Sequence, residues 1–239
     1  MGVKDFPPRV QKYINQRMTR EWGPSDDSRV SVTELLGCLR KSYLNRRHPL
    51  PADFKGNVAM FHGIVFDELY THLYPRNQIR VTHRLPNDNI VISGRLDFID
   101  DDGAVADWKT VEQMYYIEKD GAREDHISQV MFYCWCEAIP KGRLYYQTLR
   151  NCLKIDINPT REQLQLNLEC LEVLAKTFHE ALKTNMMPPV KVKKDWECTY
   201  GKGEDATYCQ YYDQCYGGRK HGKTYDILEG RGEKNSNAV

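Results

Sequence analysis

The sequence predicts an α/β protein, because stretches with helical spacing of apolar residues alternate with stretches of strand-like alternation. Its 239 residues suit one domain, or one domain with a small extra module. Apolar residues make up 41% of the chain and charged residues 28%, as in ordinary globular proteins. The net charge is only +1, so any surface that binds nucleic acid must be a local patch.

Three helices are predicted before the first strand. The first covers Arg9–Arg20 and ends at the loop-forming stretch WGPSDD. A capping box at Ser31–Glu34 begins the second, which continues through Leu39 and contains Cys38. The third covers Ala59–Tyr74, where one apolar face is formed by residues at every fourth position, namely Val65, Leu69 and Leu73.

A meander of three strands follows, in QIRVTHRL, NIVISGRLDFID and GAVADWKTV, with turns at Pro86–Asp88 and Asp100–Gly103. Next come a helix over Glu124–Ala138 and two strands, RLYYQTL and CLKIDI, joined at Arg150–Asn151. Apolar residues at helical spacing then predict a long helix that packs on the core, with Leu164, Leu168, Leu171, Leu174, Phe178 and Leu182.

The predicted hairpin carries two acids and a lysine that strands generally avoid. If the DDDG turn reverses the chain, Asp97 and Asp107 lie within about one position of each other across the strands. Lys109 shares the face of Asp107 because it lies two residues further on. Two close carboxylates repel each other unless a cation lies between them, and Mg²⁺ is commonly held by carboxylates and phosphate oxygens. The face suits phosphodiester cleavage, although a solvated hairpin is the alternative.

A second pair of polar residues lies on the following helix. Gln129 and Tyr133 are four residues apart and therefore project from one helix face. An amide and a phenol together can hydrogen-bond a phosphate or orient a metal ligand. Burial of Tyr133 in the core is the alternative.

In this order, the motifs resemble those of the PD-(D/E)xK nuclease superfamily and its RecB-like group. The matching elements are Gly94-x-x-Asp97, Asp107-x-Lys109 and Gln129-x-x-x-Tyr133. The resemblance implies a restriction-endonuclease-like fold, with a mixed central sheet flanked by helices. It also implies a Mg²⁺- or Mn²⁺-dependent deoxyribonuclease, in which Asp97 and Asp107 bind the metal and Lys109 positions the attacking water. Gln129 and Tyr133 would steady the phosphate or the metal ligands.

The upstream helix departs from the family pattern. RecB-like nucleases carry G-x-x-x-H-E, whose histidine binds metal, whereas this chain has Asp67 at that position and His62 just before the glycine, Gly63. Residues five apart point about 140° apart on a helix, so His62 and Asp67 do not both reach one ion. We expect Asp67 to be the third metal ligand, with His62 as the alternative.

The eight cysteines fall into two groups. Four lie in apolar patterns and are expected to be buried, namely Cys134, Cys136, Cys152 and Cys170.

The other four are Cys38, Cys198, Cys209 and Cys215. One cysteine before the nuclease motifs and three after them resembles the CRISPR-associated RecB-like iron–sulfur exonuclease family and its phage and viral relatives. The resemblance implies a structural [4Fe–4S] cluster, with [2Fe–2S] or Zn²⁺ as alternatives. Ten residues separate Cys198 from Cys209 where the family usually has two.

The expected segments are an N-terminal extension (1–30), the nuclease core (31–190), a cluster-binding segment (191–216) and a disordered tail (217–239). The expected partners are DNA, as single strands or ends, and CRISPR integration or recombination proteins. Basic residues beside the cysteines are expected to contact the strand, namely Arg40, Lys41, Arg46, Arg47, Lys191, Lys193 and Lys194.

With no membrane-span pattern or secretory signal, we expect a cytoplasmic protein. A DNA-binding adaptor without nuclease activity and a plain Cys₄ zinc protein are the rival interpretations.

Overall fold

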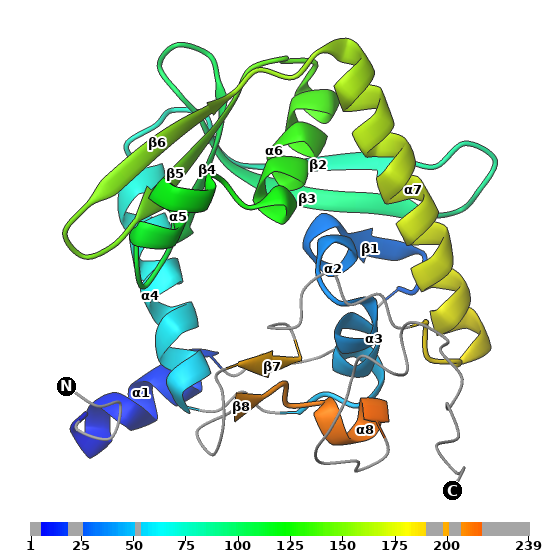
Figure 1. Cartoon of the computed structure of the whole chain (residues 1–239), viewed down its shortest axis with the longest axis horizontal. Helices are drawn as coiled ribbons and strands as arrows, with labels where there is room; N and C mark the ends of the chain where they lie inside the picture. Colours follow the sequence, from blue (N-terminus) through cyan, green and yellow to red (C-terminus); the bar gives the residue numbers. More distant parts are fainter. Residues whose placement is uncertain (1–5, 19–25, 51–53, 190–197, 201–206, 217–239) are drawn as a thin grey trace, which may run out of the picture. The chain divides into compact units, whose positions relative to one another are not determined.

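The structure is a computed structural model, which describes residues 6–18, 26–50, 54–189, 198–200 and 207–216 (Figure 1). The chain divides into two units, residues 1–193 and 194–239. The strands of the first unit are β1 (Arg29–Ser31), β2 (Asn77–Arg84), β3 (Val91–Ile99), β4 (Val105–Thr110), β5 (Gly142–Gln147) and β6 (Cys152–Ile157). Its helices are α1 (Pro8–Met18), α2 (Val32–Leu36), α3 (Leu39–Arg47), α4 (Phe54–Thr71), α5 (Tyr115–Asp120), α6 (Glu124–Glu137) and α7 (Arg161–Thr184).

Strands β1 to β6 form one mixed sheet in the described part of this unit. Antiparallel β2 pairs with β3 from Val91 to Phe98, which occupies one edge of β3. The other edge is therefore shared by parallel β1, at Val91–Ser93, and antiparallel β4, at Phe98–Ile99. Strand β5 is parallel to β4, and β6 is antiparallel to β5. Between β1 and β4, residues 94–97 of β3 border an opening in the sheet.

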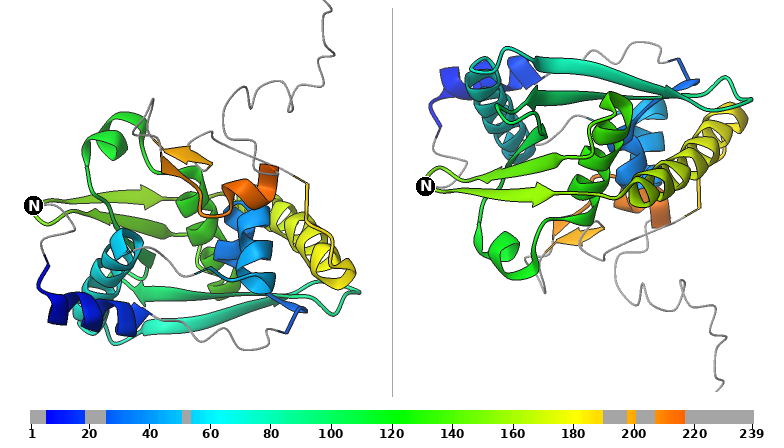
Figure 2. Two further views of the ribbon diagram at one scale, coloured as in Figure 1. Left: turned by 90° about the horizontal axis from the view of Figure 1, so that it is seen from below. Right: turned by 90° about the horizontal axis from the view of Figure 1, so that it is seen from above.

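Helix α6 packs in the concave side of the twisted sheet, with β2–β3 and β5–β6 on either side of it (Figure 2). It also contacts α2 and α7. A Cβ atom at Gly142 would meet Val130 Cγ1 of α6 at 2.4 Å, so the absence of a side chain on β5 permits this close packing. The predicted mixed sheet flanked by helices is confirmed.

The predicted turns form where glycine and asparagine tolerate positive φ. Asn87 has φ 63° and Gly103 has φ 81°. The acids of the second turn pair with Arg143, a buried residue of β5 that contacts Asp100 and Asp102 and lies 2.7 Å from Asp156. The acidic run around the turn therefore has a structural role that is separate from that of Asp97 and Asp107.

The predicted helix beginning at Ser31 is two helices. The capping box forms as expected, since Ser31 accepts a hydrogen bond from Glu34 N and Glu34 accepts one from Ser31 N. Gly37 then adopts extended backbone and ends α2, and Cys38 is the N-cap of α3. Cys38 therefore lies at a helix start rather than inside a helix.

The prediction that Val65, Leu69 and Leu73 form the buried face of α4 was wrong. Val65, Leu69 and Leu73 are all exposed in the structure. The helix instead packs against Ile14 and Met18 of α1 through another set of residues, which comprises Val58, Phe61 and Ile64. Two of the four cysteines expected in the core, Cys152 and Cys170, are also exposed, because they lie on the solvent sides of β6 and α7.

The second unit contains β7 (Thr199–Tyr200), β8 (Thr207–Tyr208) and α8 (Tyr212–Tyr216). The two strands pair antiparallel, with Thr199 opposite Tyr208. Residues 217–239, the predicted tail, lie outside the described residues. In the described parts of both units, no helix is long and apolar enough to cross a membrane.

Candidate active site

A cavity of about 600 Å³ opens where β1 and β4 diverge along β3. Its walls come from β1, α2, α4, β2, β3, β4 and α6. It brings together five of the predicted site residues, namely Asp67, Asp97, Asp107, Lys109 and Gln129. Tyr133 lies directly behind Gln129, whose Nε2 donates a hydrogen bond of 2.7 Å to the Tyr133 hydroxyl.

The two strand acids face each other at the point where β3 and β4 separate. The last paired residues are Phe98 with Ala106, and the next step in the same register places Asp97 opposite Asp107. Asp97 Oδ2 accepts a 2.7 Å hydrogen bond from Trp108 N, while Asp107 is only 2% exposed. Asp107 Oδ2 lies 2.5 Å from Lys109 Nζ, so the ammonium is in direct contact with this carboxylate.

The environment of Asp97 and of Asp67 disfavours the charged form of these two side chains. Burial raises the pKa of Asp97 well above its ordinary value, and the neighbouring carboxylate of Asp107 raises it further. Lys109 and the hydrogen bond from Trp108 oppose this shift. Burial likewise raises the pKa of Asp67. The cavity therefore has carboxylates that a cation would stabilise in their charged form.

Lys109 is held in place by a short chain of polar contacts. Its ammonium contacts Asp107 on one side and donates a 3.0 Å hydrogen bond to Gln129 Oε1 on the other. Because Gln129 in turn donates to Tyr133, all three side chains have defined directions. Burial raises the pKa of Tyr133, so its hydroxyl stays neutral.

The glycine of the G-x-x-D element makes room for this chain of contacts. A Cβ atom at Gly94 would lie 2.6 Å from Cε1 of Tyr133 and 3.3 Å from Cγ1 of Val32. The ring of Tyr133 therefore packs directly on the backbone of β3. The motif alone identifies this glycine, but only the packing of Tyr133 explains why it has no side chain.

On α4, Asp67 faces the cavity and His62 does not. Asp67 lines the cavity wall, whereas His62 is exposed and lies outside it. Gln78 Nε2 donates hydrogen bonds of 2.9 and 3.1 Å to the two carboxylate oxygens of Asp67. Gln78 has φ 50°, a conformation that non-glycine residues rarely adopt, and the strand register places it opposite Asp97. The sequence carried no signal for Gln78, since its role depends on this local backbone conformation.

The acids of the cavity supply some of the ligands that a divalent cation needs. The buried carboxylate of Asp107 and the facing carboxylate of Asp97 supply oxygen ligands of the kind that Mg²⁺ and Mn²⁺ take. Across the described residues, no three histidine, cysteine or acidic side chains converge closely enough to hold a metal by themselves. The predicted set of Asp67, Asp97 and Asp107 therefore does not form a complete metal site by itself, and phosphate oxygens and water would have to supply the remaining ligands of Mg²⁺.

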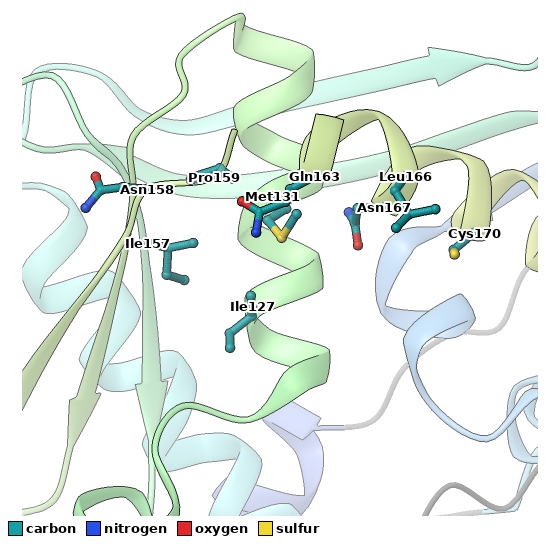
Figure 3. A pocket seen from close by; sticks show the side chains of 9 residues that line it. All are labelled: Ile127, Met131, Ile157, Asn158, Pro159, Gln163, Leu166, Asn167 and Cys170. Carbon is teal, nitrogen blue, oxygen red and sulfur yellow. The ribbon is translucent and has the colours of Figure 1, made fainter. Parts of the chain in front are cut away.

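A second hollow lacks such chemistry. It has a volume of about 490 Å³ and lies between α6 and α7 near the end of β6 (Figure 3). Its wall has no carboxylate, histidine or basic side chain, and is formed by Ile127, Met131, Ile157, Asn158, Pro159, Gln163, Leu166, Asn167 and Cys170. The cavity at β3 and β4 is therefore the candidate active site.

Two of the arginines expected to contact DNA have structural partners. Arg46 is nearly buried and pairs with Glu34 through two hydrogen bonds of 2.7 Å. Arg47 pairs with Asp27 and donates to the Leu182 carbonyl. These contacts tie α3 to α2 and α7 and give both arginines a structural role, while their contact with DNA stays a prediction. Lys191, Lys193 and Lys194 lie outside the described residues.

The cysteine-rich segment has one informative feature within the second unit. The β7–β8 register places Cys198 opposite Cys209, and Cys209 N donates a 2.8 Å hydrogen bond to the Cys198 carbonyl. The ten residues between them begin and end as a two-stranded ribbon. Cys215 lies in α8, six residues beyond Cys209.

Comparison with known proteins gives a family and a fold. The profile described as the PD-(D/E)XK nuclease superfamily matches residues 16–216. A solved structure titled "Crystal structure of SSO0001" matches with a TM-score of 0.56 and 18% sequence identity. The match covers 82% of this chain and 93% of that one, and shows a shared fold. No curated protein matches the chain.

Proposed function

The chain belongs to the PD-(D/E)XK nuclease superfamily, and we propose that it is a Mg²⁺- or Mn²⁺-dependent exonuclease that degrades DNA from single-stranded regions or ends. One observation carries this proposal. The cavity places the Lys109 ammonium 2.5 Å from the Asp107 carboxylate, with Asp97 opposite Asp107 and Asp67 on the facing helix.

Each residue then has a defined task. Asp97 and Asp107 would hold the cation, with Asp67 contributing from α4. When bound, the cation withdraws charge from the phosphate oxygens and acidifies the attacking water. Lys109 donates to that water or to the phosphate oxygen that gains charge during cleavage, since its ammonium is already fixed by Asp107 and Gln129. Gln129 and Tyr133 keep the lysine in this position.

The same set of residues favours an enzyme over the adaptor alternative. A protein that only binds DNA has no need for two facing acids, of which Asp97 has its charge disfavoured by burial. Retention of Asp97, Asp107 and Lys109 in one cavity therefore supports cleavage. By resemblance, we place this activity in CRISPR adaptation or in phage or viral recombination.

The exonuclease assignment is tested by comparing linear with circular single-stranded DNA in Mg²⁺ and in Mn²⁺. We expect the linear strand to be shortened progressively and the circle to remain intact, because an exonuclease needs an end. Cleavage of the circle at a similar rate would contradict the exonuclease assignment and support an endonuclease.

We further propose that Cys38, Cys198, Cys209 and Cys215 hold a [4Fe–4S] cluster with a structural role. The pairing of Cys198 with Cys209 at the base of the β7–β8 ribbon supports this, because it places the two cysteines opposite each other despite the ten residues between them. Thiolates are ligands for iron–sulfur clusters and for Zn²⁺ alike.

Metal analysis of anaerobically purified protein separates these possibilities. We expect about four iron and four sulfide per chain, and a Cys215→Ser variant that loses most of the iron. Cys170→Ser, which changes an exposed cysteine outside the set, is the control and should retain it. Zinc without iron would favour the zinc alternative, and two iron per chain would favour [2Fe–2S].

A further inference from the structure

Two arginines face each other across β2 and β3 beside the candidate active site. Arg80 of β2 is paired directly with Arg95 of β3 in the antiparallel ladder. Both side chains are exposed, and both line the cavity that holds Asp97 and Asp107. The two strands run side by side along their length (Figure 1).

This arrangement is unfavourable without a ligand. Like charges directly opposite each other on neighbouring strands destabilise a sheet. In the part of the chain that the structure describes, neither Arg80 nor Arg95 forms an ion pair or a side-chain hydrogen bond. By contrast, Arg46 and Arg143 each have carboxylate partners. Because no carboxylate of the described residues forms an ion pair with Arg80 or Arg95, an anionic ligand would complete the pair.

The pair lies at a suitable place for a nucleic-acid strand. Arg95 and Asp97 share one face of β3, and two residues of an antiparallel strand span about 7 Å. This is close to the separation of successive phosphates along a nucleic-acid strand.

Further polar groups extend the same face away from the acids. Thr82 and Ser93 also line the cavity and form the next cross-strand pair on this face, two residues beyond Arg80 and Arg95. Ser31 of β1 is paired with Ser93. A strand that enters along this face therefore meets hydroxyl groups, then the two guanidinium groups, and then the acids.

We propose that Arg80 and Arg95 together bind the phosphate next to the one that is cleaved, and so align the nucleic-acid strand with the acids. The proposal rests on the proposed function and adds the path of its substrate. Arginine suits this task because its planar guanidinium donates two parallel hydrogen bonds to a phosphate.

The test measures binding of a fluorescein-labelled single-stranded oligonucleotide by anisotropy, in EDTA, at several salt concentrations. For the Arg80→Ala/Arg95→Ala double variant we expect at least tenfold weaker binding. We also expect a shallower dependence of log K on log salt, by about 0.7 for each phosphate that the variant no longer neutralises. A double variant with lysine at both positions should keep most of the salt dependence and recover part of the affinity.

Arg150→Ala is the matched control. Arg150 is an exposed arginine in the β5–β6 turn, outside the cavity, so its removal changes the local charge without touching the proposed path and should leave binding unchanged. Thermal unfolding of each variant checks that the fold is intact. The proposal is overturned if the double alanine variant binds with the affinity and salt dependence of the wild type.

Cleavage in Mg²⁺ and Mn²⁺, measured in parallel, separates this proposal from the proposed function. If the wild type cleaves DNA and the double alanine variant has an unchanged half-saturating DNA concentration, only the arginine proposal fails. If the wild type binds DNA through the two arginines and does not cleave it, only the proposed function fails. A wild type that neither binds nor cleaves DNA contradicts both.

Discussion

Asp97 has its charge disfavoured by burial and by Asp107, while Trp108 N holds one of its oxygens in place. The backbone hydrogen bond explains how a strand accommodates a carboxylate in this position, and the raised pKa indicates that this bond and Lys109 do not offset burial and the nearby Asp107. A bound cation would supply the further stabilisation. Without one, the acid reduces the stability of the protein at neutral pH.

Replacement of Asp97 by asparagine should therefore stabilise the metal-free protein. Because the folded pKa of Asp97 is raised, its contribution to stability is fully present below the ordinary pKa and is lost as pH rises through the folded value. In EDTA at pH 7, Asp97→Asn should raise Tm, by about 2–4 °C for each kcal/mol gained. The advantage should shrink towards pH 4, where the wild-type carboxyl is protonated as well. A lower Tm for the variant at pH 7 would contradict this interpretation of Asp97.

Gly94 is the second residue whose identity follows from its surroundings. Gly94→Ala should reduce the free energy of unfolding by about 1–3 kcal/mol, because the new Cβ overlaps the Tyr133 ring. Gly37→Ala is the control, since its Cβ would meet only Thr33 O at 3.6 Å and Gly37 has negative φ. Chemical denaturation measures both. Adding Tyr133→Ala to Gly94→Ala should remove the overlap, so a purely additive effect in the double variant would argue against this contact.

At the scale of elements, the local residue pattern and the backbone preferences of turn residues made most of the strands and turns predictable. The turns at Asn87 and Gly103 form because these residues accept positive φ, and the resulting hairpin sets Asp97 against Asp107. Periodicity could not predict which face of α4 is buried, because apolar residues occur on both faces. Val65 and Leu69 lie on the exposed face, and Val58 and Phe61 lie on the packed face. Only the packing of α1 against one of them decides between the two.

The orientation of α4 also decides which residue can reach the metal. Asp67→Ala should raise the Mn²⁺ concentration needed for half-maximal cleavage by about tenfold or more, because it removes a cavity-lining carboxylate. His62→Ala should leave it unchanged, since His62 is exposed and lies outside the cavity. Titration of activity with Mn²⁺ gives both values. A large effect of His62→Ala with none for Asp67→Ala would reverse the assignment.

At the scale of the whole molecule, the sheet assembles a site from segments far apart in the sequence. Acids on β3 and β4, Asp67 on α4 and Gln129 on α6 meet only because β1 and β4 diverge along one edge of β3. The motifs made Asp97, Asp107 and Gln129 predictable, because their order along the chain is characteristic of the family, and Asp67 was predicted from the position that it takes in the helix pattern. Gln78 and the Arg80–Arg95 pair have no such motif, and their roles depend on strand register and backbone conformation.

The central claim is that this cavity cleaves phosphodiester bonds with the help of a divalent metal and Lys109. The most direct measurement is degradation of end-labelled single-stranded DNA by anaerobically purified protein, in Mg²⁺, in Mn²⁺ and in EDTA. The wild type should be compared with Lys109→Ala and with Lys154→Ala, which removes an exposed lysine of β6 outside the cavity. We expect cleavage only with metal, a rate reduced by about a hundredfold or more in Lys109→Ala, and wild-type rates in Lys154→Ala. Cleavage that persists in EDTA, or equal rates for the wild type and Lys109→Ala, would contradict the account.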